Sequence, residues 1–116
     1  MSATVNVRYS GSVAIVDVNG RVSLSEGLGL MRDTVRQEIN SGYKYVVLNL
    51  AGVVYMDSAA LAEMASAFIA VTGKGGKLRL ANAQQRIQEM LRVTRLSSLL
   101  ENYDSEAGAL ASLGIR

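Results

Sequence analysis

Apolar and polar residues alternate at the start of the chain, over residues 4–9 and again over residues 12–18. A period of two is typical of a strand with one buried face. Gly11 lies between the two runs and suits a tight turn. The pattern therefore predicts two strands joined as a hairpin, with Gly20 ending the second.

A helical period follows in residues 25–41. Its apolar residues are spaced by three and four, at Leu28, Met31, Val35 and Ile39. Candidate caps for its start are Ser23 with Glu26, or Ser25 alone, and Gly42 supplies a stop. Because Gly27 and Gly29 each cost a helix about 1 kcal/mol, the first turn is expected to be weak.

A second helix is predicted from Asp57-Ser58 to about Thr72. Its apolar stripe consists of Leu61, Met64, Phe68 and Val71. Alanines fill much of the remaining surface and permit a close approach to a sheet. The strand before it, residues 45–50, is apolar at nearly every position and suits the centre of that sheet.

The remaining chain continues the alternation of strands and helices. Residues 77–81 predict a short strand, and residues 84–92 a third helix. Residues 99–103 are ambiguous, with a short edge strand as one interpretation, and residues 105–113 predict a fourth helix. The whole pattern predicts an α/β fold over residues 1–116: one domain with a mixed β-sheet of four to five strands and about four helices packed on it.

The composition of the chain excludes several classes of catalytic, metal and binding site. The chain has no His and no Cys, which excludes the usual zinc sites, Ser-His-Asp and Cys-His catalysis, and disulfides. Its net charge is only +2 and aromatic residues are 5%, so we expect no nucleic-acid role. We expect no membrane role either, because the uncharged run 45–56 is too short for a spanning helix. The N-terminal sequence lacks a signal-peptide pattern, and we expect a cytoplasmic protein.

Two features resemble known functional motifs but lack residues or spacing that those motifs require. The run Gly73-Lys74-Gly75-Gly76-Lys77 lacks phosphate-loop spacing and precedes a strand rather than a helix. Asp57 follows a buried strand, as the phosphorylated aspartate of a receiver domain does. The acidic pair that such a site needs for magnesium is missing, because Asp17 stands alone.

Ser58 is the position with two open interpretations. Its hydroxyl could cap the second helix, because serine is among the commonest caps. Alternatively it could carry a phosphate, which would meet free amide donors and the positive end of the helix dipole. Spacing alone favours the cap.

The chain resembles the STAS domains of bacterial anti-sigma factor antagonists, also called anti-anti-sigma factors. The resemblance rests on residues 45–58, which read YVVLNLAGVVYMDS, and on residues 75–80, which read GGKLRL. Gly20 and the later helices appear in the family's order. The family signature of a hydrophobic residue, Asp and Ser is matched at the N-terminus of the second helix by Met56-Asp57-Ser58.

The resemblance implies a protein-binding switch without enzymatic activity, cofactor or metal. The unphosphorylated form of such a protein binds an anti-sigma factor serine kinase and so releases a sigma factor. That kinase phosphorylates the signature serine, here Ser58, and a metal-dependent serine phosphatase reverses the modification. Asp57 would orient the loop and the hydroxyl. The expected partner-binding residues are Asp57, Ser58, Ala59, Ala60 and Glu63, the last as an exposed residue of the second helix.

The sequence departs from the family at one place. The family usually continues Asp-Ser with Ser or Thr and then Gly, whereas Ala59 and Ala60 follow here. The methyl group of Ala60 is expected to favour the helix by about 1 kcal/mol and to obstruct the partner's approach. The alternative function is an unphosphorylated STAS scaffold or ligand-binding module in a lipid-transport or stress-sensing complex. The oligomeric state stays open between a monomer and a weak homodimer.

Overall fold

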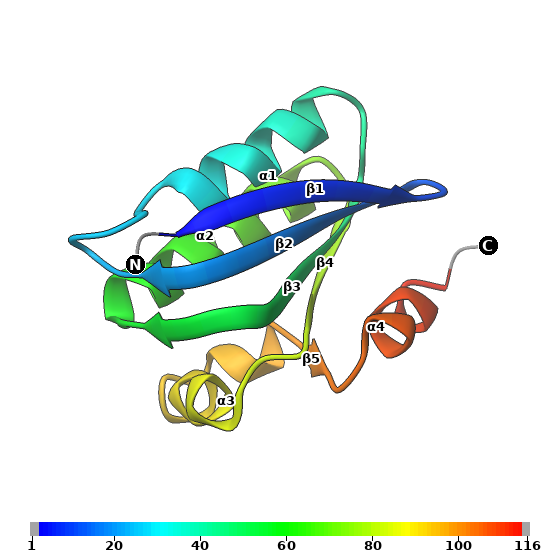
Figure 1. Cartoon of the computed structure of the whole chain (residues 1–116). Coiled ribbons are helices and arrows are strands. Elements are labelled where there is room, and N and C mark those ends of the chain that lie inside the picture. The colour runs from blue at the N-terminus through cyan, green and yellow to red at the C-terminus, as the bar shows by residue number, and fades with distance from the viewer. Residues whose placement is uncertain (1–2, 115–116) are drawn as a thin grey trace.

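The computed structural model describes residues 3–114 and contains one five-stranded sheet in the order β1-β2-β3-β4-β5 (Figure 1). The strands are β1 Thr4–Ser10, β2 Val13–Val22, β3 Tyr45–Met56, β4 Lys77–Ala81 and β5 Asn102–Tyr103. The helices are α1 Leu30–Asn40, α2 Ser58–Gly73, α3 Gln85–Val93 and α4 Glu106–Ser112, with a 3₁₀ turn, η1, at Leu96–Ser98. The predicted α/β fold is confirmed.

The sheet is mixed, as the sequence predicts. β1 pairs with β2 in the antiparallel direction, through a turn in which Gly11 has a φ of 56°. The other three pairings are parallel. Each parallel connection therefore contains a helix that crosses back over the sheet.

The helices cover the two faces of the sheet unequally. α1, α2 and α3 pack on one face, where they share the main core with β3 through Val46, Leu48 and Leu50. α4 packs on the opposite face, over a smaller cluster that includes Val47. Both faces of β3 are thus buried over its first half, which confirms the predicted central strand.

The start of α1 differs from the prediction. The helix begins at Leu30 rather than near residue 25, because Gly27 and Gly29 have φ values of 69° and 91° and interrupt the helix there. Gly29 is the residue at the N-cap, so neither predicted serine cap is used. Leu28 lies outside the helix and is 43% exposed. Residues 23–29 instead form a loop that passes close to the start of α2.

The C-terminal elements match their predictions. The ambiguous apolar segment does contain a short edge strand, β5, and the Ser105 hydroxyl caps α4 by accepting a hydrogen bond from the Gly108 amide at 3.0 Å. Arg8 of β1 reaches Glu106 of α4 at 2.6 Å and Asp17 of β2 at 2.6 Å. These ion pairs tie α4 to the open face of the sheet.

Replacing Gly76 with Ala should destabilise the protein. A Cβ at this position would lie 2.0 Å from the Lys44 carbonyl oxygen, which is backbone and cannot rotate away. We expect the free energy of unfolding, measured in urea, to fall by about 1 to 3 kcal/mol. Gly73→Ala is the matched control, because nothing lies within 4 Å of its added Cβ, and it should leave stability unchanged or raise it. Equal losses in both variants would contradict the close approach at Gly76.

Candidate functional site at the start of helix α2

The predicted signature Met56-Asp57-Ser58 lies where β3 ends and α2 begins. Asp57 has extended backbone angles, with φ −109° and ψ −176°, and is the N-cap residue. Its Oδ1 accepts a hydrogen bond from the Ala60 amide at 3.0 Å. The interpretation of Ser58 as the cap is therefore wrong, because Asp57 holds that position and Ser58 is the first residue inside the helix.

The Ser58 side chain is exposed to solvent. Among residues 3–114 its hydroxyl has no hydrogen-bond partner, and α2 begins without using it. Modification of this oxygen would therefore remove no hydrogen bond made by the Ser58 hydroxyl itself.

Asp57 also holds the loop between β2 and α1. Its second oxygen, Oδ2, accepts a hydrogen bond from the Leu24 amide at 2.9 Å. This bond is the main reason that the pKa of Asp57 lies below its ordinary value of 3.8, and the amides of Ala60 and Ala59 lower the pKa further. The sequence predicts that a phosphate on Ser58 would meet free amides, but the Asp57 carboxylate already occupies the Ala60 amide.

Glu63 does not lie on the surface, contrary to the prediction. Its residue is 4% exposed, and its carboxylate accepts hydrogen bonds from the Gly29 amide at 2.8 Å and the Arg32 amide at 2.9 Å. Those amides belong to the N-terminus of α1, which lacks a side-chain cap of its own. Glu63 thus caps α1 from α2, and the anionic side chain suits the positive end of the helix dipole.

Helical spacing shows which face of α2 carries Glu63. It lies three residues after Ala60 and four before Ala67, both fully buried, so it shares their face of the helix. The predicted apolar stripe of Leu61, Met64, Phe68 and Val71 lies beside that face, and a buried carboxylate there needs partners such as the uncapped amides of a neighbouring helix.

Ala60 also differs from its predicted place. Its residue is fully buried in the main core, so its methyl group points away from any partner. The expectation that this methyl obstructs a partner is wrong. Of the five predicted contact residues, Asp57 and Ala59 are half-buried and Ser58 is exposed, and these three are accessible.

A groove lies between Ser58 and α3. Its volume is about 230 Å³, and besides Ser58 it is lined by Leu61, Met90, Val93, Thr94 and Glu89. Val93 is 67% exposed, and Leu24, whose amide is bonded to Asp57, is 73% exposed. Sequence periodicity did not single out either residue as functional.

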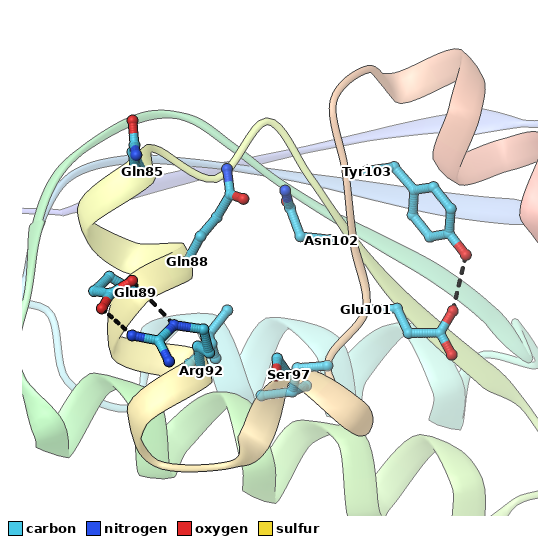
Figure 2. Close-up of a pocket in the computed structure, with 10 residues that line it drawn as sticks. Gln85, Gln88, Glu89, Arg92, Ser97, Glu101, Asn102 and Tyr103 are labelled. Carbon is cyan, nitrogen blue, oxygen red and sulfur yellow. Dashed lines mark hydrogen bonds and ion pairs between the residues drawn. The ribbon is translucent and has the colours of Figure 1, made fainter.

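A larger hollow of about 530 Å³ lies between α3, η1 and β5 (Figure 2). Its lining is mostly polar, and the side chains of Gln88 and Asn102 both point into it. None of the residues predicted for the site lines this hollow. It shares only Glu89 with the groove beside Ser58, and there Glu89 forms an ion pair with Arg92.

No group of three or more acidic residues within residues 3–114 is placed to hold a metal ion. Over the same residues, no helix combines the length and apolar character that crossing a membrane would require.

Comparison with known proteins identifies the family. The sequence pattern of the STAS domain matches residues 4–109, and the chain belongs to this family. The anti-sigma F factor antagonist of Paenibacillus polymyxa is 22% identical over 120 residues, which cover 99% of this chain and 98% of that protein.

Solved structures show the same fold. An anti-sigma factor antagonist from Mycobacterium paratuberculosis superposes with a TM-score of 0.87 at 17% identity, over 98% of this chain and 96% of that one. The phosphorylated form of the Bacillus cell fate determinant SpoIIAA superposes with a TM-score of 0.72 at 13% identity, over 94% and 98% of the two chains. The fold thus occurs in proteins described as anti-sigma factor antagonists.

The carboxylate of Asp57 should stabilise the protein in a pH-dependent way. Because the folded pKa is depressed, its contribution is full above the ordinary value of 3.8 and is lost as the pH falls through the folded pKa. Unfolding in urea at a series of pH values should show Asp57→Asn less stable than wild type at about pH 6. The difference should shrink towards about pH 2.5. A difference that stays constant across this range would contradict the role of the charge.

Glu63→Gln should destabilise the protein because the amide side chain offers only one acceptor to two backbone donors. Its NH₂ group would face the amide of Gly29 or Arg32 in a buried site. We expect the free energy of unfolding to fall by about 1 to 3 kcal/mol. The control is Glu89→Gln on α3, an exposed residue whose surface ion pair contributes little to stability. If both variants lose the same stability, the cap from Glu63 is not significant.

Proposed function

We propose that the protein is an anti-sigma factor antagonist whose binding is controlled by phosphorylation of Ser58. In its unphosphorylated form it binds an anti-sigma factor serine kinase, and a sigma factor is released. The kinase then phosphorylates Ser58, and a metal-dependent serine phosphatase restores the binding form. The protein itself carries out no chemistry. Membership of the STAS family and the names of its relatives support this assignment.

The observation that carries the proposal is the state of the Ser58 hydroxyl. It is exposed and unbonded within the described residues, although it lies at a helix start where serine hydroxyls commonly cap. Asp57 takes over the capping and leaves the serine free. A kinase can therefore reach an oxygen that the fold does not require.

The charge explains how the modification would act on binding. A phosphoserine adds about −1.5 to −2 charges at pH 7. In the free protein this charge stays in water near the positive end of α2. In a packed interface it must lose its water, and a penalty of about 3 kcal/mol would lower affinity by about a hundredfold.

The proposed contact surface centres on Asp57, Ser58 and Ala59. It extends along the exposed side of α2 to Ala62, one turn after Ser58. Ala60 and Glu63 are excluded because both are buried. The small side chains of this stripe leave the helix backbone open to a close approach.

Ser58→Asp should weaken binding to the cognate anti-sigma factor kinase by about tenfold or more, whereas Ser58→Ala should bind persistently. The binding is measured by titration calorimetry with purified anti-sigma factor serine kinases from the source organism. Incubation of wild type with the bound kinase and ATP should add one phosphate to the intact mass, and Ser58→Ala should add none.

Ser12→Asp is the matched control, because Ser12 is exposed in the β1–β2 turn, beside the start of β3 rather than its end. It introduces the same charge away from α2 and should bind as wild type does. Equal binding by the Ser58→Asp and Ser58→Ala variants, with no phosphate added to wild type, would exclude the switch.

A further inference from the structure

The loop of residues 23–29 connects β2 to α1 and lies at the same end of the molecule as the start of α2 (Figure 1). The loop and the first residue of α1 present three exposed leucines: Leu24 at 73%, Leu28 at 43% and Leu30 at 37%. Exposed apolar side chains gathered in one short segment are candidates for a protein contact. Leu24 lies beside the proposed switch, because its backbone amide donates to Asp57, the residue before Ser58.

The loop is attached to α2 at two points, each a carboxylate that accepts backbone N–H groups. At one end, Oδ2 of Asp57 accepts from Leu24 at 2.9 Å. At the other end, Oε1 of the buried Glu63 accepts from Gly29 at 2.8 Å. Between these attachments the loop makes a turn of its own, in which the Ser23 amide donates to the Glu26 carbonyl at 2.8 Å.

Only the first attachment adjoins Ser58. Asp57 uses Oδ1 to cap α2 and Oδ2 to hold the loop, so the same carboxylate joins the helix start to Leu24. A phosphate on the next residue would place a dianion beside this carboxylate and would compete for the same N-terminal amides of α2. Repulsion and competition both act to draw Asp57 away from its two donors.

We propose that the leucine loop, residues 23–30, is a contact element for the same anti-sigma factor kinase that recognises Ser58, and that phosphorylation of Ser58 releases this loop through Asp57. The inference rests on the proposed function for the identity of the partner. The occupant follows from position, since the Leu24 amide is hydrogen-bonded to Asp57, one of the three residues that form the proposed contact surface. The phosphate thus acts twice, by its own charge in the interface and by loosening the apolar element beside it.

Glu63 gives the proposal an internal control. It lies further along α2 and is buried, so a phosphate on Ser58 leaves its bond to Gly29 in place. The loop should therefore loosen at its Leu24 end and stay attached at its Gly29 end. A general destabilisation of the protein would instead affect both ends alike.

The release is tested without any partner. Phosphoserine is incorporated at position 58 during translation, and amide hydrogen exchange is followed by NMR in the full chain. We expect the exchange rate of the Leu24 amide to rise by about tenfold or more, while that of Gly29 changes by less than about twofold. Phosphoserine at position 12 is the control and should change neither. An unchanged Leu24 amide in protein fully phosphorylated at Ser58 would overturn the release.

The contact is tested by binding. The double variant Leu24→Ser, Leu28→Ser should lower affinity for an anti-sigma factor serine kinase that binds Ser58→Ala, by about tenfold or more. Ile69→Ser on α2 is the matched control, because Ile69 is 68% exposed but lies about three turns beyond Ser58, and it should bind as wild type does. Far-UV circular dichroism and unfolding in urea verify that each variant is folded.

The two tests separate the inference from the proposed function. If Ser58→Asp weakens binding but the leucine variant binds as wild type does, the contact is overturned and the phosphorylation switch stands. If the leucine variant loses affinity and Ser58→Asp does not, the contact stands and the switch fails. Equal losses for the leucine variant and for Ile69→Ser would also overturn the contact, because the effect would then not be specific to the loop.

Discussion

The candidate site depends on the way backbone amides at two helix starts are satisfied by carboxylates. The N-cap residue of α1 is Gly29, which has no side chain to cap the helix, and the buried Glu63 of α2 provides the missing acceptor. The N-cap residue of α2 is Asp57, which caps its own helix and holds Leu24 of the loop before α1. The start of α1 is thus linked to α2 through Glu63, and the start of α2 is linked to the loop before α1 through Asp57. These two links fix the surface on which Ser58 lies. Uncapped amides in this half-buried region would cost about 1 to 3 kcal/mol each.

The same pair of carboxylates shows how far the sequence could predict the molecule. Periodicity predicted the hairpin, the central strand β3, the long helix α2 and the weak first turn of α1, because these depend on local apolar spacing and on glycine. Glu63 was placed on the surface, because a glutamate in a helix is exposed in most proteins. Its burial depends on an unpaired amide 34 residues away in the sequence, which no local pattern reveals.

The role of Asp57 and Ser58 was ambiguous for a different reason. Both residue types cap helices, and the sequence places them side by side, so the spacing alone cannot assign the cap. The backbone decides, because Asp57 is extended whereas Ser58 already belongs to the helix. The replacement of the family's usual glycine by Ala60 was also misread, since the helix turns that methyl into the core. The identity of the cap depends on the residue at which α2 starts, and the direction of the Ala60 methyl group depends on how α2 is rotated against the sheet.

The position of Ser58 inside the first turn of α2 supports the proposed modification, because the fold does not depend on its hydroxyl. A serine at the N-cap would lose its capping bond when phosphorylated, and such caps contribute about 0.5 to 2 kcal/mol. The Ser58 hydroxyl makes no such bond, and the attraction of the helix dipole for a phosphate, about 0.3 to 1 kcal/mol, opposes the repulsion from Asp57. The proposed modification would therefore act on the local contacts of Asp57 and leave the core intact. A helix start capped by one residue and modified at the next can therefore change its surface while the sheet and core stay intact.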